Sequence, residues 1–329
     1  MKKFLTLICA FVMALTACAG LVACGGNGDG DNGGVTPPPA PAPAGPTSLT
    51  YTSLGNQYDT LTEVLNEGAD IAVVEKAVFN YWVKSEVNDS LMIVAGDQFV
   101  FEKEEYVMAC KQGTDVAEYF NAAMYYLQEN SIEINGTNVL GEVDWDIADI
   151  ASFFNLSESL ITIQKPSVVW NDEPALNSEF SRILVDGFNV GFVVDTQTRH
   201  NFNHPFAGLS HFGGHEGFET MITRGIARLY GKTNTTANEK FVNYEDAKDA
   251  LANGTVDVLV GGFSTEDWGT GFDFTVPYFS NSHVLVIRKE DASKYNSFSK
   301  MKNAQFIVAS NSKGEALVKT GAIKTAVLG

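Results

Sequence analysis

Paired cysteines are missing from the body of this 329-residue chain. Of its 4 cysteines, Cys9, Cys18 and Cys24 fall in the N-terminal segment, so Cys110 is the only thiol left after processing and lipidation. No disulfide framework is therefore available, and the hydrophobic core must hold the fold. Cys110 ends the apolar run Tyr106-Val107-Met108-Ala109-Cys110, which predicts a buried strand residue; a nucleophile is the alternative.

Positive charge is also scarce. The chain has 22 Lys and Arg against 40 Asp and Glu, a formal net charge of −18. This balance argues against nucleic acid and against an anionic membrane surface as the partner. The hydrophobic content of 45% is ample for a core. The body of about 280 residues has the size of one large domain or two lobes.

A long apolar run is lacking as well. Lys2 and Lys3 precede an apolar stretch at residues 4–14, which is typical of a secretory signal. The stretch is shorter than the ~20 residues that a membrane-spanning helix needs, and Thr16 interrupts it.

A bacterial lipoprotein cleavage box ends this signal. Leu21-Val22-Ala23-Cys24 matches the box, which predicts a signal peptide at residues 1–23 and a diacylated Cys24; Leu15-Thr16-Ala17-Cys18 also fits, so Cys18 is the alternative. Residues 24–47 are rich in Gly and Pro, so they should form a tether that buries no apolar surface.

One phrase of sequence occurs twice in the body. Residues 58–74 and 244–260 both place a Leu seven positions after a Tyr and a Gly three positions later, followed by an Asp and an apolar run. The apolar positions before each Gly have helical spacing, and the run after it is typical of a buried parallel strand. Gly68 and Gly254 are expected to take the left-handed conformation that ends a helix. Internal pseudo-symmetry explains the repeat, and a chance match of two common units is the alternative.

Further strands and helices alternate along the chain. Strands are expected at residues 106–110, 189–194 and 283–287, and helices at residues 116–128 and 218–230. This alternation predicts an α/β fold.

Several motifs follow one another from residue 189 onward. They are Pro205-Phe206, Gly217-Phe218-Glu219, the stretch from Leu251 to Asp257, Asp273-Phe274-Thr275-Val276-Pro277-Tyr278, and a strand that ends in Arg288-Lys289. In this order they resemble the opening lobe of the bacterial family 3 solute-binding proteins, the receptors of polar amino-acid ABC transporters. Asn311-Ser312-Lys313-Gly314-Glu315 is similar to the loop that opens the second lobe of that family. The resemblance implies a two-lobed, type 2 periplasmic-binding-protein fold, each lobe being a mostly parallel sheet flanked by helices.

The rest of the family's pattern precedes this segment. Residues 65–74 resemble the helix–Gly–strand unit of its second lobe, one residue short between Gly68 and Asp70. Residues 104–113 resemble its return hinge strand, and residues 152–156 resemble its end. The reversed order predicts a circular permutation, which is feasible where the old chain ends can be joined; two spliced gene fragments are the alternative.

The permutation assigns the chain to two lobes. Lobe two should comprise residues 48–105 plus 289–329, and lobe one residues 106–288, with a new linker at residues 157–185. It follows that residues 326–328 should lie beside residues 49–51.

The resemblance also implies a ligand site between the two lobes. The matching positions are Phe206, Phe263, Ser264, Thr265, Trp268, Ser312, Lys313 and Glu75. Phe206 would be an aromatic platform, with a core aromatic as the alternative. Ser312 and Lys313 could meet an anionic group, and Glu75 would receive the ligand's ammonium group.

Trp268 departs from the family's pattern. It stands three residues after Thr265, where members that bind α-amino acids carry an Arg for the carboxylate. An indole removes that ionic partner and supplies a stacking face. Because Glu75 is kept, a cationic or aromatic ligand, or an amino acid held differently, is expected.

Neither a nucleophile–base pair nor a cofactor motif can be read from the sequence, and no enzymatic activity is predicted. Glu75, Glu219 and the histidines of the loop before Gly217 are acid–base candidates only by their presence. His200, His204, His211 and His215 share one Gly-rich loop without acidic or thiol partners, which predicts no metal site.

The expected protein is a monomer, lipid-anchored on the extracytoplasmic side of the cell membrane. It would pass a small polar solute, amino-acid-like or cationic, to an ABC transporter permease. A ligand sensor without a transporter and a dehydratase-like enzyme on the same fold are the alternatives.

Overall fold

The structure is a computed structural model. It describes residues 48–86, 88–135, 142–156, 159–193, 205–209, 215–231 and 238–329. The predicted signal peptide, the lipidation cysteines and the tether lie outside these residues.

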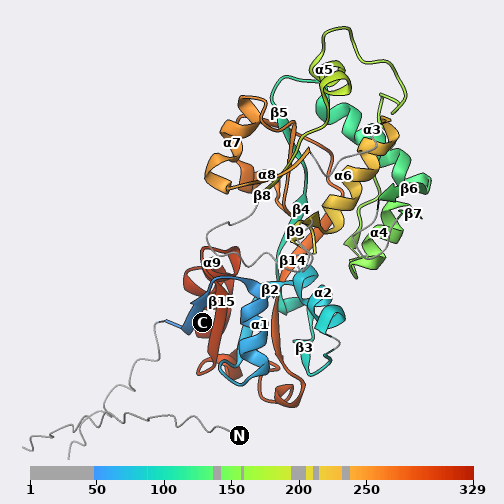
Figure 1. Cartoon of the computed structure of the whole chain (residues 1–329). Coiled ribbons are helices and arrows are strands. Elements are labelled where there is room, and N and C mark those ends of the chain that lie inside the picture. The colour runs from blue at the N-terminus through green and yellow to red at the C-terminus, as the bar shows by residue number, and fades with distance from the viewer. Residues whose placement is uncertain are drawn as a thin grey trace, which may run out of the picture. The chain divides into compact units, whose positions relative to one another are not determined.

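Lobe two is built around a six-stranded sheet that contains strands from both chain ends (Figure 1). Its strands, in spatial order, are β1 (Thr50–Leu54), β15 (Gln305–Ala309), β2 (Ile71–Glu75), β14 (Phe279–Arg288) and β3 (Leu91–Ile93), with β4 (Val100–Tyr106) also paired to β14. The first three strands are parallel, and β14 is antiparallel to its neighbours. In Figure 1 the N-terminal elements, in blue, and the C-terminal elements, in red, therefore lie side by side.

Apolar side chains cover both faces of this sheet. Ile71 and Val73 of β2 lie in one core cluster, while Ala72 and Val74 lie in another, as expected of a strand between two helix layers. The helices of the lobe are α1 (Gln57–Leu65), α2 (Lys76–Glu86), α9 (Lys313–Lys319) and α10 (Ala322–Leu328).

The two chain ends meet in one of these clusters. Leu49 and Val327 belong to the same buried cluster, and Tyr51 and Leu328 pack against it. Residues 49–51 and 326–328 therefore contribute to one core, and the expected direct proximity of the two segments stays a prediction.

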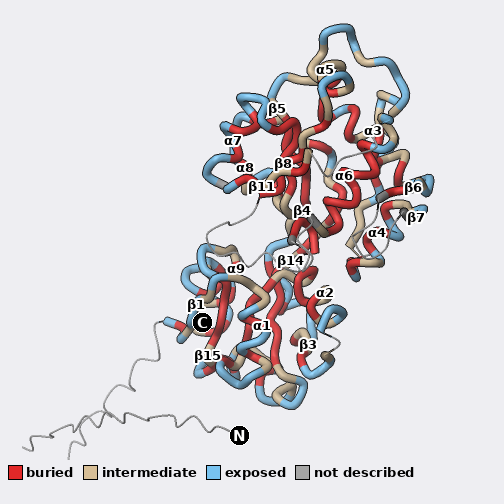
Figure 2. The backbone as a smooth tube through the Cα atoms, viewed as in Figure 1, coloured by how far each residue is buried: buried red, intermediate tan, exposed pale blue. Residues whose placement is uncertain are grey.

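Lobe one is built around a five-stranded sheet. Its strands, in spatial order, are β11 (Glu239–Val242), β8 (Val190–Val193), β12 (Val258–Val260), β5 (Ala109–Lys111) and β13 (Phe272–Phe274). Its helices are α3 (Val116–Glu129), α4 (Ile147–Phe153), α5 (Glu179–Asp186), α6 (Phe218–Leu229), α7 (Tyr244–Ala252) and α8 (Thr265–Trp268). Figure 2 shows that much of the strand and helix interior of both lobes is buried.

Smaller elements complete the described chain. They are the strand pairs β6 (Ile132–Asn135) with β7 (Glu142–Trp145) and β9 (Gly208–Leu209) with β10 (His215–Glu216), and the 3-10 turns Asp97–Phe99, Lys289–Asp291 and Phe298–Met301. Within the described residues, no helix combines the length and apolar character needed to cross a membrane.

The two sheets share one plan. In each, three parallel strands are followed by an antiparallel crossing strand and one further strand, so β1, β15, β2, β14 and β3 correspond to β11, β8, β12, β5 and β13. Internal pseudo-symmetry, predicted from the repeated phrase, is therefore visible in the sheet order.

Two aspartates occupy equivalent places in this plan. Asp257 accepts a hydrogen bond from Asn189 N at 2.8 Å, and Asp257 N donates to Asn189 O at 2.8 Å. Asp70 exchanges the same two bonds with Gln305, each at 2.9 Å. Each carboxylate thus ties the start of its own strand to the neighbouring parallel strand.

The left-handed residue after α1 is Glu67 (φ 64°), not Gly68, whereas Gly254 (φ 75°) follows α7 as predicted. Glu67 and Gly254 each stand three positions before the shared Asp, which removes the one-residue slip seen in the sequence. The prediction for Gly68 is wrong, because the left-handed residue that follows α1 is Glu67 and not the glycine after it.

Two other expectations need correction. The apolar run at residues 106–110 is not one strand, since β4 ends at Tyr106 and β5 begins at Ala109. The predicted lobe boundary at Arg288 does not coincide with a sheet boundary, because His283 to Arg288 of β14 pair with β2 and β3 of lobe two.

Candidate functional site

Two chain segments pass from one sheet to the other next to each other. One joins β4 to β5 through Val107 and Met108, and the other joins β13 to β14. Thr275 N donates to Met108 O at 3.0 Å, and Tyr278 N donates to Tyr106 O at 3.2 Å. The two crossings are therefore hydrogen-bonded to each other, as in a double-stranded hinge.

Glu75 ends β2 beside this crossing. Its Oε1 accepts from Gln57 Nε2 at 2.8 Å, and its Oε2 accepts from Tyr106 OH at 2.7 Å and Asn281 Nδ2 at 2.8 Å. Gln57 also accepts from Glu75 N at 2.7 Å. Side chains from α1, β4 and β14 thus hold the half-buried carboxylate of Glu75 at the hinge. Burial raises the pKa of Tyr106, and the nearby charge of Glu75 raises it further.

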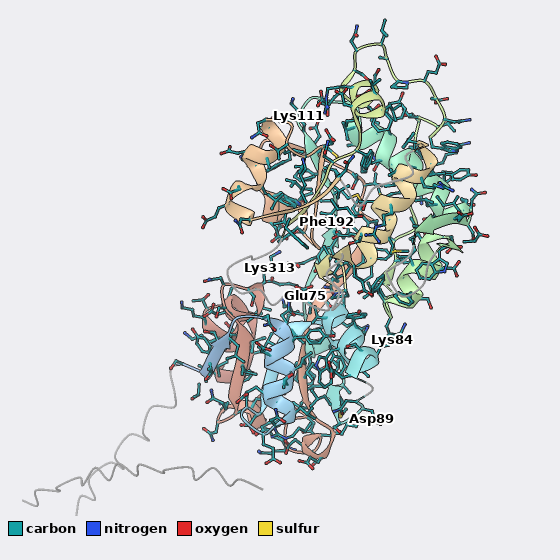
Figure 3. The ribbon with its side chains drawn as sticks, viewed as in Figure 1. Glu75, Lys84, Asp89, Lys111, Phe192 and Lys313 are labelled. Atoms are coloured by element: carbon teal, nitrogen blue, oxygen red, sulfur yellow. The ribbon has the colours of Figure 1, made fainter. Side chains whose placement is uncertain are left out.

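Lys313 links the two lobes. Its Nζ donates to Glu104 Oε1 of β4 and lies 3.0 Å from Asp267 Oδ1 of α8. Burial alone would lower the pKa of Lys313, but the bonds to Glu104 and Asp267 raise it above the usual value. Figure 3 shows Glu75 and Lys313 in lobe two.

Negative charge predominates in this cluster. Burial raises the pKa of Glu104 to about 7, although Lys313 acts in the opposite direction. Burial lowers the pKa of His283, so this imidazole is neutral at neutral pH despite the nearby Glu75. The carboxylates of Glu104 and Asp267 contact one cation, Lys313, and the charge of Glu75 lies close enough to Glu104 to raise its pKa further. We call these four residues with His283 the interlobe cluster.

His283 adds an unsatisfied polar atom. Its side chain is buried, with the residue only 3% exposed, and its Nδ1 has no hydrogen-bond partner among the described residues. A buried unpaired nitrogen is costly, and a bound solute or a water could satisfy it.

Ser264 and Asp267 form a capping box at the start of α8. Ser264 N and Oγ both donate to Asp267 Oδ2 at 2.8 Å. The box leaves Asp267 Oδ1 directed to Lys313, so the local helix start positions an interlobe contact.

The predicted site residues fall into two groups. Glu75 and Lys313 are in the interlobe cluster, and Ser264 holds a member of it. Ser312 instead caps α9, where its Oγ accepts from Glu315 N at 3.1 Å and donates to Ala309 O at 2.7 Å. Thr265 is exposed at the first position of α8.

The predicted aromatic contacts are placed differently. Phe206 is fully buried, with its ring centroid 5.0 Å from that of Tyr106, so it is a core residue and presents no platform. Trp268 is buried between Phe263 and Phe272, at centroid distances of 4.9 and 5.7 Å, so its indole is not an exposed stacking face. Packing against these rings removes the apolar area of both side chains from water, which favours the buried positions.

Glu219 is buried in lobe one and holds the loop that leads to α8. Gly262 N donates to its two carboxylate oxygens at 3.1 and 3.0 Å, and Tyr278 OH donates to Oε1. Burial raises the pKa of Glu219 to about 7, although these donors act in the opposite direction. Because its carboxylate binds the backbone of Gly262, Glu219 positions the loop that leads to α8.

Sequence reasoning missed several members of the site: Gln57, Glu104, Tyr106, Asp267, Asn281 and His283. Alternating burial along β14 would have pointed to Asn281 and His283, which are polar residues at inward positions. The Ser264-x-x-Asp267 spacing would have pointed to the capping box.

Metal ligation gains no support in the described part of the chain, where no group of three His, Cys, Asp or Glu side chains converges. His200, His204 and His211 lie outside the described residues, and His215 belongs to β10.

Residues 198–326 match the family of bacterial extracellular solute-binding proteins, family 3. The chain has the fold of a type 2 solute-binding protein. The match covers the segment whose motifs predicted it, and the two sheets joined by paired crossings agree with the two-lobed architecture. It supports a solute-binding role outside the cytoplasm.

A solved structure is also similar to the chain. It is a phosphate ABC transporter, phosphate-binding protein from Streptococcus pneumoniae TIGR4, with 7% sequence identity, a TM-score of 0.34, and coverage of 78% of this chain and 84% of that one. This TM-score is too low to carry weight, so the fold assignment rests on the family match and the sheet order. No curated protein matches the chain.

Proposed function

We propose that this chain is a lipid-anchored, non-enzymatic receptor that captures a small cationic or amino-acid-like solute between its lobes and presents it to an ABC importer. The family match supports solute binding, and the interlobe cluster supports the choice of solute. The cluster carries more carboxylates than cations, and excess negative charge in a partly buried site favours a cation.

The contact of Lys313 with both lobes carries the proposal. Its ammonium group lies between Glu104 of lobe two and Asp267 of lobe one, 3.0 Å from the latter. A solute ammonium group could make the same bonds, and this would favour the closed arrangement of the lobes.

Calorimetric titration with a panel of cationic amino acids, neutral amino acids and polyamines tests the proposal. We expect stoichiometric binding of a cationic member, which is recovered unchanged. Glu75→Gln should weaken that binding about tenfold to hundredfold, the usual effect of losing a bond to a charged group. Glu118→Gln, on the exposed face of α3, is the control. Turnover of the ligand would indicate an enzyme, and equal affinities of Glu75→Gln and Glu118→Gln would exclude Glu75 from the site.

We also propose that the chain is a circular permutant. In lobe one, β8 leads through α6 to the edge strand β11. In lobe two, β15 leads through α9 and α10 to the C-terminus, while the equivalent edge strand, β1, begins the described chain. The edge strand β1 therefore precedes its sheet partner β15 in the chain, whereas the equivalent edge strand β11 follows β8, and this difference in strand order supports permutation over spliced fragments.

A rearranged chain tests this proposal. It would run from residue 159 to 329, continue through a short Gly-Ser linker into residue 48, and end at residue 156. We expect the near-UV circular dichroism and the thermal midpoint of the original order. A chain that stays unfolded, while the original order folds under the same conditions, would count against permutation.

The anchor is proposed to be a diacyl group on Cys24, with Cys18 as the alternative. Incorporation of an alkyne-tagged fatty acid in the producing bacterium would be lost in Cys24→Ser and retained in Cys18→Ser. The opposite pattern would move the anchor to Cys18.

Recovery of a permease with the crosslinked receptor would distinguish an importer subunit from a sensor.

A further inference from the structure

A cavity lies beside the hinge, and none of the interlobe-cluster residues lines it. It has a volume of about 380 Å³, and its polar lining comes from α2, the two paired strands β4 and β14, and the segment after residue 158. The polar residues are Lys76, Lys103, Ser159, Ser280, Asn281 and Ser282. We call it the hinge pocket.

The hinge pocket has the opposite electrostatic character to the interlobe cluster. Two lysines line it, and no described lining residue carries a carboxylate. Glu105 and Glu104 lie opposite Ser280 and Asn281 in the β4–β14 pair, but neither glutamate lines the pocket. Two lysines in the lining of one pocket are unexpected in a chain of net charge −18.

Strand geometry explains how the lining is assembled. Lys103 lies directly opposite Ser282 in the β4–β14 pair, so the two side chains share one face of the sheet. Side chains alternate along β14, so Ser280 and Ser282 project on one face while Asn281 projects on the other, toward Glu75.

The lining groups are mostly hydrogen-bond donors. Lysine ammonium groups supply donors only, and serine hydroxyls can donate as well as accept. Lys76 is also the first residue of α2, an 11-residue helix whose N-terminal end carries a partial positive charge. A small oxyanion offers several acceptor oxygens to such a set.

We propose that the hinge pocket binds a small inorganic or organic oxyanion, such as phosphate, independently of the solute in the interlobe cluster. A bound oxyanion would contact α2, β4 and β14. Asn281 is a lining residue of the pocket, but its side chain lies on the other face of β14, where Nδ2 donates to Glu75 Oε2 at 2.8 Å and to Tyr106 OH at 2.7 Å.

Calorimetric titration of the mature protein with inorganic phosphate, at constant ionic strength, tests the proposal. We expect saturable binding that Lys76→Met/Lys103→Met weakens by about tenfold for each lysine, the effect of losing a charge-assisted bond. Lys302→Met/Lys319→Met removes the same charge from two exposed positions that do not line the pocket, and it should bind like the wild type.

Asp267→Asn separates the two sites, because Asp267 belongs to the interlobe cluster and contacts Ser264 and Lys313, neither of which lines the hinge pocket. It should retain phosphate affinity whether or not the proposed solute site is correct, so either proposal can fail alone. Absence of saturable phosphate binding by the wild type would overturn the hinge-pocket proposal. Equal affinities of the two double-lysine variants, with unchanged thermal midpoints, would also overturn it.

Discussion

The buried carboxylate of Glu219 should make the stability of lobe one depend on pH. It is fully buried at the start of α6, where it holds Gly262 N and Tyr278 OH. Glu219→Gln removes the titrating group while keeping one oxygen that can accept from Gly262 N. The side-chain volume is almost unchanged, so the variant mainly tests charge.

The magnitude follows from the raised pKa of this carboxyl. Burial raises the pKa of Glu219 from 4.5 to about 7. A tenfold difference in proton affinity between the folded and unfolded states corresponds to about 1.4 kcal/mol, so the effect is roughly 3 kcal/mol. Because the folded state holds the proton more tightly than the unfolded state, the contribution to stability is greatest below about pH 4.5 and is lost as the pH rises through 7.

Urea unfolding across this pH range measures the effect. The free energy of unfolding should fall less steeply with pH in Glu219→Gln than in the wild type, by up to about 3 kcal/mol over the window. Burial also raises the pKa of Glu104, which remains in both proteins, so only the difference between their curves is diagnostic. Glu118→Gln is the control. Parallel curves for Glu219→Gln and the wild type would refute the reasoning.

Three further predictions concern packing and charge. Trp268→Ala should lower the free energy of unfolding by about 3–5 kcal/mol in chemical denaturation, because it empties a buried site in lobe one; a loss below about 1 kcal/mol would contradict its core position. Lys313→Met should raise the pKa of Glu104 further above its ordinary value, because Lys313 lowers that pKa in the wild type. Carboxyl NMR titration measures the change, and an unchanged pKa would show that the contact is absent. Removal of α10 takes the buried side chains of Ile323 and Val327 out of the core and should lower the free energy of unfolding by roughly 3–6 kcal/mol. Amide hydrogen exchange in β1 and β15 should become faster, and unchanged exchange would contradict a core shared by α10 and these strands.

The sequence predicted the main elements because their apolar patterns are local. The repeated phrase predicted two helix–strand units, α1 with β2 and α7 with β12, and the structure confirms both. Its Gly was a less dependable marker than its Asp, because Asp70 and Asp257 make equivalent bonds while a glutamate takes the left-handed position after α1. Long-range hydrogen bonding requires the Asp, and the helix end tolerates another residue.

The site was harder to predict than the fold. Glu75 and Lys313 were named from the resemblance, but Tyr106 and Asn281 meet Glu75 only through strand pairing between distant segments. The resemblance places Trp268 at the ligand because it stands at the family's Arg position, but a position in a loop says nothing about the direction of the side chain. Burial of an indole depends on partners such as Phe272, which the chain brings together only in three dimensions.

Binding of a cationic solute by the interlobe cluster is tested most directly by one titration series. The tightest cationic ligand of the panel should be titrated into the wild type, Glu75→Gln, Asp267→Asn and Glu118→Gln at neutral pH. We expect a single site, weakened about tenfold or more in both cluster variants and unchanged in Glu118→Gln. Saturable binding of neutral or anionic solutes alone, with full affinity in both cluster variants, would contradict it.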